Sequence, residues 1–145
     1  MPATCLTVLL SAAGIFTAVL GTLHFLLPTL LDYRTMLLDR PADWKTPRPF
    51  RVWLTHYVVN AQDRYGIVWI MNHAASYTLV SIGLLDLLGA QWLQSDTGRP
   101  FALWIAGWWF LRAVAQLYLG RRIGDMLILV FFAALGLLHL AIWLA

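Results

Sequence analysis

The sequence predicts an all-α, polytopic integral membrane protein whose helices cross the bilayer as a four-helix bundle. Of its 145 residues, 61% are hydrophobic and 12% are charged, whereas ordinary soluble domains are about 45–50% apolar and about a quarter charged. The mean hydropathy is +0.72. A small soluble fold leaves much of its surface in water and could not cover so many apolar side chains. Lipid could cover them.

Four apolar segments have the length of about 20 residues that a spanning helix needs. The predicted spans are residues 5–27, 66–86, 101–119 and 125–145, in a single transmembrane domain over 1–145. Pro28 is expected to end the first span, because proline lacks the N–H that continues a helix. Helices are the expected form because hydrocarbon offers no partner to unpaired backbone groups.

The connection over 28–65 is predicted to carry an amphipathic helix that lies in the membrane interface. Apolar residues recur there at helical spacing, at Phe50, Trp53, Leu54, Tyr57, Val58 and Ala61. Polar residues such as Arg51 and Thr55 fall largely on other faces. This pattern predicts an interfacial helix over about 50–63. The alternative is an N-terminal extension of the second span.

Basic residues predict the orientation. The connection 28–65 carries Arg34, Arg40, Lys45, Arg48, Arg51 and Arg64, and the connection 120–124 carries Arg121 and Arg122. The connection between the second and third spans has only Arg99. Because cytoplasmic connections are enriched in arginine and lysine, 28–65 and 120–124 are expected in the cytoplasm. Both termini are then expected on the opposite, non-cytoplasmic side.

Several polar residues fall inside the predicted spans, all within the cytoplasmic half of the bilayer. They are His24, Asn72, His73, Arg112 and Gln116. Ionisable groups at such depth are costly and are candidates for function. Since they come from separate spans and share one half of the bilayer, the sequence predicts a polar pocket in the cytoplasmic half. The alternative is purely structural hydrogen bonding between helices.

Such a pocket predicts the binding or conversion of a lipophilic molecule with a polar head group, and leaves open whether the protein is an enzyme. His73 and His24 are the candidate catalytic acid–base residues, because imidazole titrates near neutral pH. The candidate substrate-binding residues are Arg112, Gln116, Asn72, Asp63 and Arg64. Arg112 would hold an anionic or carbonyl oxygen. Asp63 and Arg64 would lie at the cytoplasmic mouth.

Other function classes remain open. A haem-b or quinone-linked redox subunit would use His24 and His73 as axial ligands to iron. A scaffold or accessory subunit of a membrane complex, or a homo-oligomer, would use stripes of small residues as helix contacts. Transport is a weaker alternative, since the sequence shows no inverted repeat.

Some classes of site and partner are not expected. Cys5 is the single cysteine, which excludes an internal disulfide, and the chain has no zinc motif. No metal site is therefore predicted. Nucleic acid is not an expected partner, because the basic residues lie where membrane topology would place them. His139, apart from the predicted pocket, is expected to be a core histidine with its hydrogen bonds satisfied.

Overall fold

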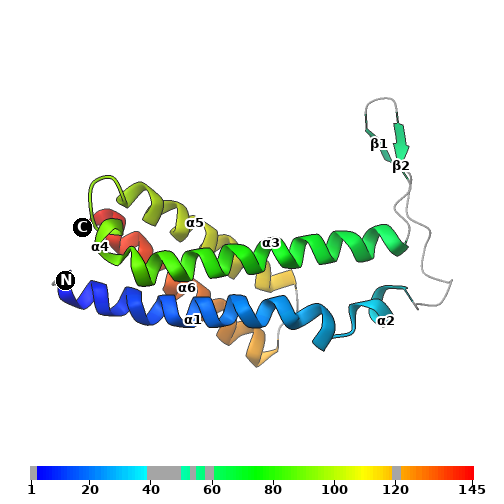
Figure 1. Cartoon of the computed structure of the whole chain (residues 1–145), viewed down its shortest axis with the longest axis horizontal. Helices are drawn as coiled ribbons and strands as arrows, with labels where there is room; N and C mark the ends of the chain where they lie inside the picture. Colours follow the sequence, from blue (N-terminus) through cyan, green and yellow to red (C-terminus); the bar gives the residue numbers. More distant parts are fainter. Residues whose placement is uncertain (1–2, 39–49, 53–54, 58–60, 119–121) are drawn as a thin grey trace. The chain divides into compact units, whose positions relative to one another are not determined.

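The computed structural model describes residues 3–38, 50–52, 55–57, 61–118 and 122–145. In chain order its elements are α1 (Ala3–Leu30), α2 (Tyr33–Leu38), β1 (Phe50–Val52), β2 (Thr55–Tyr57), α3 (Ala61–Leu88), α4 (Ala90–Leu93), α5 (Arg99–Ala115), the 3-10 helix η1 (Gln116–Tyr118) and α6 (Ile123–Leu144) (Figure 1). The chain divides into two compact units. Unit 1 comprises Met1–Ala18 and Ser81–Ala145, and unit 2 comprises Val19–Val80.

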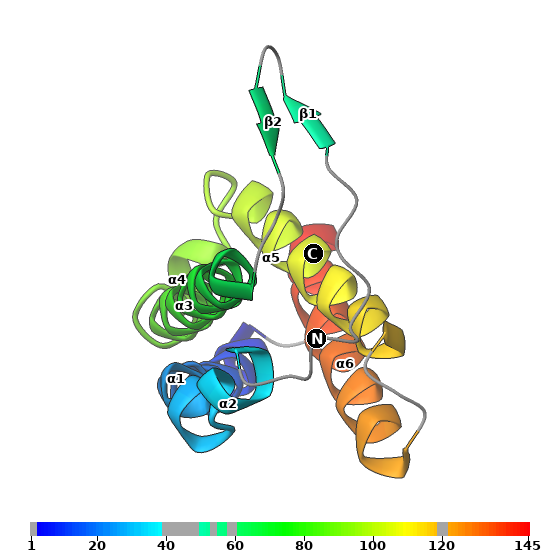
Figure 2. The ribbon, with the colours of Figure 1, turned by 90° about the vertical axis from the view of Figure 1, so that its right-hand side faces the viewer.

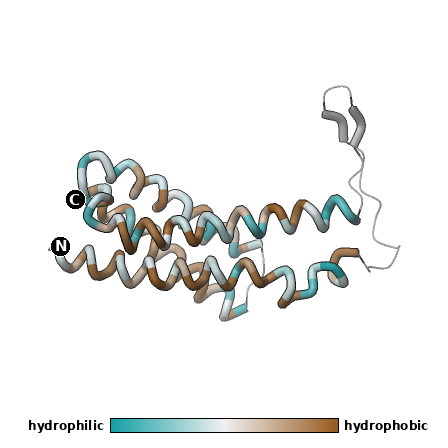
Figure 3. Tube along the Cα trace, viewed as in Figure 1, coloured by the Kyte–Doolittle hydropathy of each residue, from teal (hydrophilic) through white to brown (hydrophobic). Residues whose placement is uncertain are grey.

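Among the described residues, three helices are long and apolar enough to cross a membrane. They cover Thr4–Leu30, Gln62–Leu88 and Ile123–Leu144. In Figure 3 hydrophobic residues recur along α1, and hydrophilic residues mark the start of α3. Large apolar side chains stay exposed on all three helices, among them Val8, Ile70 and Leu127. Such surfaces suit hydrocarbon better than water. The prediction of a helical chain with bilayer-length helices is confirmed to this extent.

The first helix runs past its predicted end. Pro28 lies inside α1, which continues to Leu30, so the expectation that this proline stops the helix is wrong. The turn comes at Asp32, whose φ of 45° is left-handed and typical of a chain leaving a helix. The Asp32 carboxylate then accepts the backbone N–H of Thr35 at 3.3 Å and caps α2. Hydrogen bonds from Thr35 lower the pKa of Asp32.

The predicted amphipathic helix over 50–63 is wrong for residues 50–52 and 55–57. These form an antiparallel strand pair with Phe50 opposite Tyr57 and Val52 opposite Thr55. The residue types fit strands, because aromatic and β-branched residues alternate with Arg51 and His56. Residues 53–54 and 58–60 of the predicted helix lie outside the described residues. From Ala61 onward the chain belongs to α3. This part agrees with the alternative prediction, an N-terminal extension of the second span.

In unit 1, α5 and α6 lie side by side (Figure 2). Small residues allow this approach, since Ala102, Ala106 and Ala113 are buried on α5. On α6, a Cβ at Gly136 would lie 2.8 Å from the Phe110 ring. In lipid, no hydrophobic driving force brings helices together. They associate through close packing, which small residues allow.

Glycines also bring α1 and α3 together within each unit. In unit 1 a Cβ at Gly83 would lie 2.5 Å from the backbone nitrogen of Ala18, and one at Gly14 would lie 2.8 Å from the Gly83 carbonyl oxygen. In unit 2 a Cβ at Gly21 would lie 2.7 Å from the backbone nitrogen of Val80. The two helices therefore meet backbone to backbone at these points.

Gly83→Ala is expected to lower the free energy of unfolding by about 1–3 kcal/mol, because its methyl group would overlap the backbone of α1. Gly107→Ala is the matched control, since nothing lies within 4 Å of a Cβ there. Alanine at that helix position is expected to stabilise by about 0.5–1 kcal/mol. Thermal unfolding in detergent measures both. Equal melting of Gly83→Ala and the wild type would contradict the close packing.

Candidate functional site

The predicted site residues of unit 2 begin with His24, one turn before Pro28 on α1. In a regular helix the His24 carbonyl would accept the N–H of residue 28, but proline has none. The side-chain amide of Asn72 on α3 donates to that carbonyl oxygen at 3.0 Å. A neighbouring helix thus supplies the missing donor, as happens at prolines in membrane helices. This explains why α1 continues through Pro28.

Ser76 completes the network. Its hydroxyl donates to the Asn72 carbonyl oxygen at 2.7 Å, so its oxygen is left to accept from Nδ1 of His24, 3.1 Å away. The neutral His24 ring therefore carries its proton on Nδ1 and its lone pair on Nε2. His24 and Asn72, both predicted site residues, do lie together. Ser76, which links them, was not predicted.

His73 sits in an aromatic cluster. Its Nδ1 donates to the Trp69 carbonyl oxygen at 2.9 Å. Its ring stacks on Trp69, with centroids 5.0 Å apart and planes 17° from parallel. Phe25 meets the same ring edge-on at 5.5 Å. Carbonyl bonding again places the lone pair on Nε2, which suits either acid–base chemistry or ligation.

Haem ligation by His24 and His73 does not fit unit 2. A macrocycle between two axial histidines must separate the helices that carry them. Here Asn72 bonds the His24 carbonyl directly, and one turn away Gly21 meets the backbone of Val80. Direct contact between α1 and α3 leaves no room for a porphyrin between these imidazoles. The packing of α1 against α3 therefore argues against bis-histidine haem, and the quinone-linked alternative stays a prediction.

Arg112 and Gln116 belong to unit 1. Arg112 is half-buried near the end of α5, with its guanidinium carbon 6.0 Å from the Trp108 ring centroid and 5.9 Å from that of Phe132. Its Nε is buried without a hydrogen-bond partner in the described part of the chain. Gln116, one turn on, is buried. The cation is thus partly desolvated and faces aromatic rings.

Asp125, in the first turn of α6, pairs with Arg122. Its carboxylate accepts from Nε of Arg122 at 2.9 Å and from the Arg122 backbone at 3.2 Å, closing a capping box at the start of α6. This hydrogen-bonded pairing raises the pKa of Arg122, which is exposed. Among the described residues, no carboxylate pairs with Arg112.

An apolar groove of about 400 Å³ opens in unit 1 between α1 and α6. Its lining is Leu9, Ala12, Ala13 and Phe16 of α1 and Phe131, Ala134, Leu135 and Leu138 of α6. The rings of Phe16 and Phe131 meet at 4.5 Å at one end. Phe131 precedes Phe132, the residue that Arg112 faces. Along the axis of α6, the groove therefore starts at the same height as the guanidinium of Arg112.

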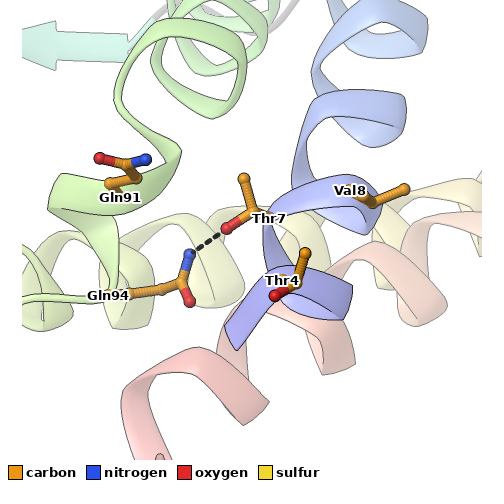
Figure 4. Close-up of a pocket in the computed structure, with 5 residues that line it drawn as sticks. All are labelled: Thr4, Thr7, Val8, Gln91 and Gln94. Carbon is orange, nitrogen blue, oxygen red and sulfur yellow. Dashed lines mark hydrogen bonds between the residues drawn. The ribbon is translucent and has the colours of Figure 1, made fainter. Parts of the chain in front are cut away.

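A second pocket in unit 1, of about 480 Å³, is lined by Thr4, Thr7, Val8, Gln91 and Gln94 (Figure 4). The Gln94 amide donates to the Thr7 hydroxyl at 3.0 Å and to the Ala90 carbonyl oxygen at 2.9 Å. Among the residues that the structure describes, no charged side chain lines this pocket. Its central amide ties α1 to α4, which is a structural role.

One polar pair was missed by reasoning from the sequence. Oδ1 of Asp86, on α3, lies 3.0 Å from Nε2 of His139, on α6, and both side chains are fully buried. Nδ1 of His139 bonds the Leu135 carbonyl oxygen at 2.8 Å. The signal was present: the apolar pattern continues beyond Asp86 to Trp92, so this acid lies inside a helix.

The predicted residues thus fall into two groups. His24, Asn72 and His73 lie in unit 2, with Asp63 exposed and Arg64 half-buried at the start of α3. Arg112 and Gln116 lie in unit 1. A single pocket shared by both groups stays a prediction, as does the mouth formed by Asp63 and Arg64.

Asn72→Ala is expected to cost about 1–3 kcal/mol of stability, because it leaves the part-buried His24 carbonyl without a donor. Pro28→Ala should restore an N–H inside α1 that bonds the same carbonyl. The cost of Asn72→Ala should therefore shrink in the Pro28→Ala background, and a double-mutant cycle from thermal unfolding measures this coupling. Additive effects of the two substitutions would show that Asn72 does not replace the missing donor.

Comparison with known proteins supplies no relative from which a role could be carried over. No protein-family model, no curated protein and no solved structure matches this chain. The function must therefore be argued from the chemistry of the site alone.

Proposed function

We propose that this chain is a multi-pass membrane protein with four spans, formed by α1, α3, α6 and the continuous segment of α5 and η1. The 17 residues of α5 rise about 25 Å, and the three residues of η1 add about 6 Å. Together they match the hydrocarbon thickness of about 30 Å. The basic residues favour cytoplasmic connections at 28–65 and 120–124 and non-cytoplasmic termini.

Within this architecture the protein binds a lipophilic molecule with an anionic head group, held in unit 1. One observation carries the proposal: the half-buried guanidinium of Arg112 faces two aromatic rings and has no acidic partner in the described chain. A desolvated cation in apolar surroundings is costly until an anion compensates it. Cation–π contacts compensate only part of that cost.

The groove between α1 and α6 supports the lipophilic part of the ligand. It starts at Phe131, beside the Phe132 ring that Arg112 faces, and runs along α6 to Leu138. Arg112 lies at the level of Phe132, nine residues from the start of α6, or about 14 Å into the helix by its rise. A head at Arg112 would let an apolar tail extend along the groove.

Conversion of the ligand would need further groups. Gln116, one turn from Arg112, offers an amide that can orient the head. His24 and His73 of unit 2 stay the candidate acid–base residues, with Asn72 beside His24. Binding requires only the guanidinium and the groove, so binding is the function proposed here.

Arg112→Gln is expected to weaken binding of a fluorescent long-chain fatty acid by at least about tenfold, the loss that follows when about 1.4 kcal/mol of charge-assisted hydrogen bonding disappears. The protein is held in nanodiscs of neutral phosphatidylcholine. Arg122→Gln removes the same charge from an exposed position and is expected to change affinity less than about twofold.

The uncharged fatty alcohol of equal chain length is the control ligand. Its affinity for the wild type should not exceed the affinity of the fatty acid for Arg112→Gln. If Arg112→Gln and Arg122→Gln weaken acid binding equally, the site at Arg112 does not exist. If alcohol and acid bind the wild type equally, the head group need not be anionic.

The orientation can be measured with the native Cys5, which is exposed and is the single cysteine of the chain. A membrane-impermeant maleimide added outside sealed cells should label it without lysis. Cys5→Ser with Thr35→Cys should label only after lysis, because Thr35 lies in the connection 28–65. The reverse pattern would invert the proposed topology.

A further inference from the structure

The most deeply buried ionisable groups in the described chain are Asp86 and His139. Both side chains have no exposed surface, and both belong to unit 1. The backbones of α1 and α3 meet beside the acid, where a Cβ at Gly14 would lie 2.9 Å from that of Asp86. Neither residue lines the groove or contacts Arg112. The proposed ligand site does not use this pair.

The hydrogen bonds define how many protons the pair holds. A carbonyl oxygen only accepts, so Nδ1 of His139, 2.8 Å from the Leu135 oxygen, must carry a proton. The 3.0 Å contact between Nε2 and Oδ1 of Asp86 then needs one proton between the two atoms. Without it, a lone pair would face a bare carboxylate in an apolar interior, and both would repel.

The surroundings indicate where that proton resides. Oδ2 of Asp86 is buried and has no donor among the described residues. An ionised carboxylate shares its charge over both oxygens, so half of the charge would lack any donor. A neutral acid leaves only an unpaired carbonyl oxygen, which costs much less.

Other charged groups of unit 1 do not compensate a carboxylate at this position. Arg99 pairs with Asp96, and Arg122 pairs with Asp125. Arg112 faces Trp108 and Phe132. The described parts of α1 and α6 that pack in this unit bring no further cation beside Asp86.

We propose that Asp86 and His139 form a proton-binding site inside the membrane-spanning unit, in which Asp86 is a neutral carboxylic acid that donates its O–H to Nε2 of His139. Paired acids and histidines at membrane depth are the groups from which proton relays are built. The ligand of this site is a proton, so it is distinct from the amphiphile site at Arg112.

Two substitutions of Asp86 separate the neutral acid from an ion pair. Asn keeps the shape and a neutral N–H donor for Nε2, so Asp86→Asn is expected to melt within about 2 °C of the wild type. Asp86→Ala removes the partner of His139 and should lower the melting temperature by at least about 5 °C. If Asp86→Asn instead melts as early as Asp86→Ala, a neutral donor does not replace the acid, and the proposal is overturned.

Infrared spectroscopy of the protein in a detergent without carbonyl groups at pH 7 reads the proton directly. The wild type should show the carbonyl stretch of a protonated carboxylic acid, and Asp86→Asn should remove it. Asp96→Asn, at an exposed acid of the same unit, should leave it intact. Absence of the band from the wild type refutes the neutral acid. Fatty-acid binding at Arg112 does not enter either measurement, so the two proposals fail independently.

Discussion

The structure depends on one constraint: in apolar surroundings, each polar group must find its partner within the protein. Pro28 leaves the His24 carbonyl without a donor, and Asn72 supplies one. Ser76 donates to the Asn72 carbonyl and accepts from His24. The contacts of His24 with Asn72 and Ser76 join α1 to α3 within unit 2, and the bond between Ser76 and Asn72 lies within α3. The same requirement explains why polar side chains such as Asn72, Ser76 and His139 are buried, whereas many large apolar side chains of α1, α3 and α6 are exposed.

The three described histidines of the helices meet this requirement in related ways. His73 and His139 each bond the carbonyl four residues earlier on their own helix, and His24 bonds Ser76 on the neighbouring one. Each bond engages Nδ1 and turns Nε2 away from the parent backbone. The surroundings of the imidazole then differ: the ring of His73 lies among aromatic rings, whereas Nε2 of His139 contacts a buried acid. Position, more than residue type, separates their chemistry.

Hydropathy and length were sufficient to predict the long helices, because a bilayer-length apolar segment has few alternatives. The depth that they predict for His24, Asn72 and Arg112 in a membrane stays a prediction. They failed at Pro28, since the donor that rescues α1 comes from a residue 44 positions away in sequence. They failed at 50–52 and 55–57, where the spacing of apolar residues fits both a helix and a strand. The pairing of Asp86 with His139 was out of reach, because one sequence does not show which faces of two helices meet.

The bond between Gln94 and Thr7 spans 87 positions of the chain. During synthesis α1 is made before α3 and α4, so Gln94 becomes available to Thr7 only when both later helices are complete. Contacts so distant in sequence form late, because the intervening chain must first be ordered. The beginning of α1 is therefore fixed in place by one of the later steps of folding.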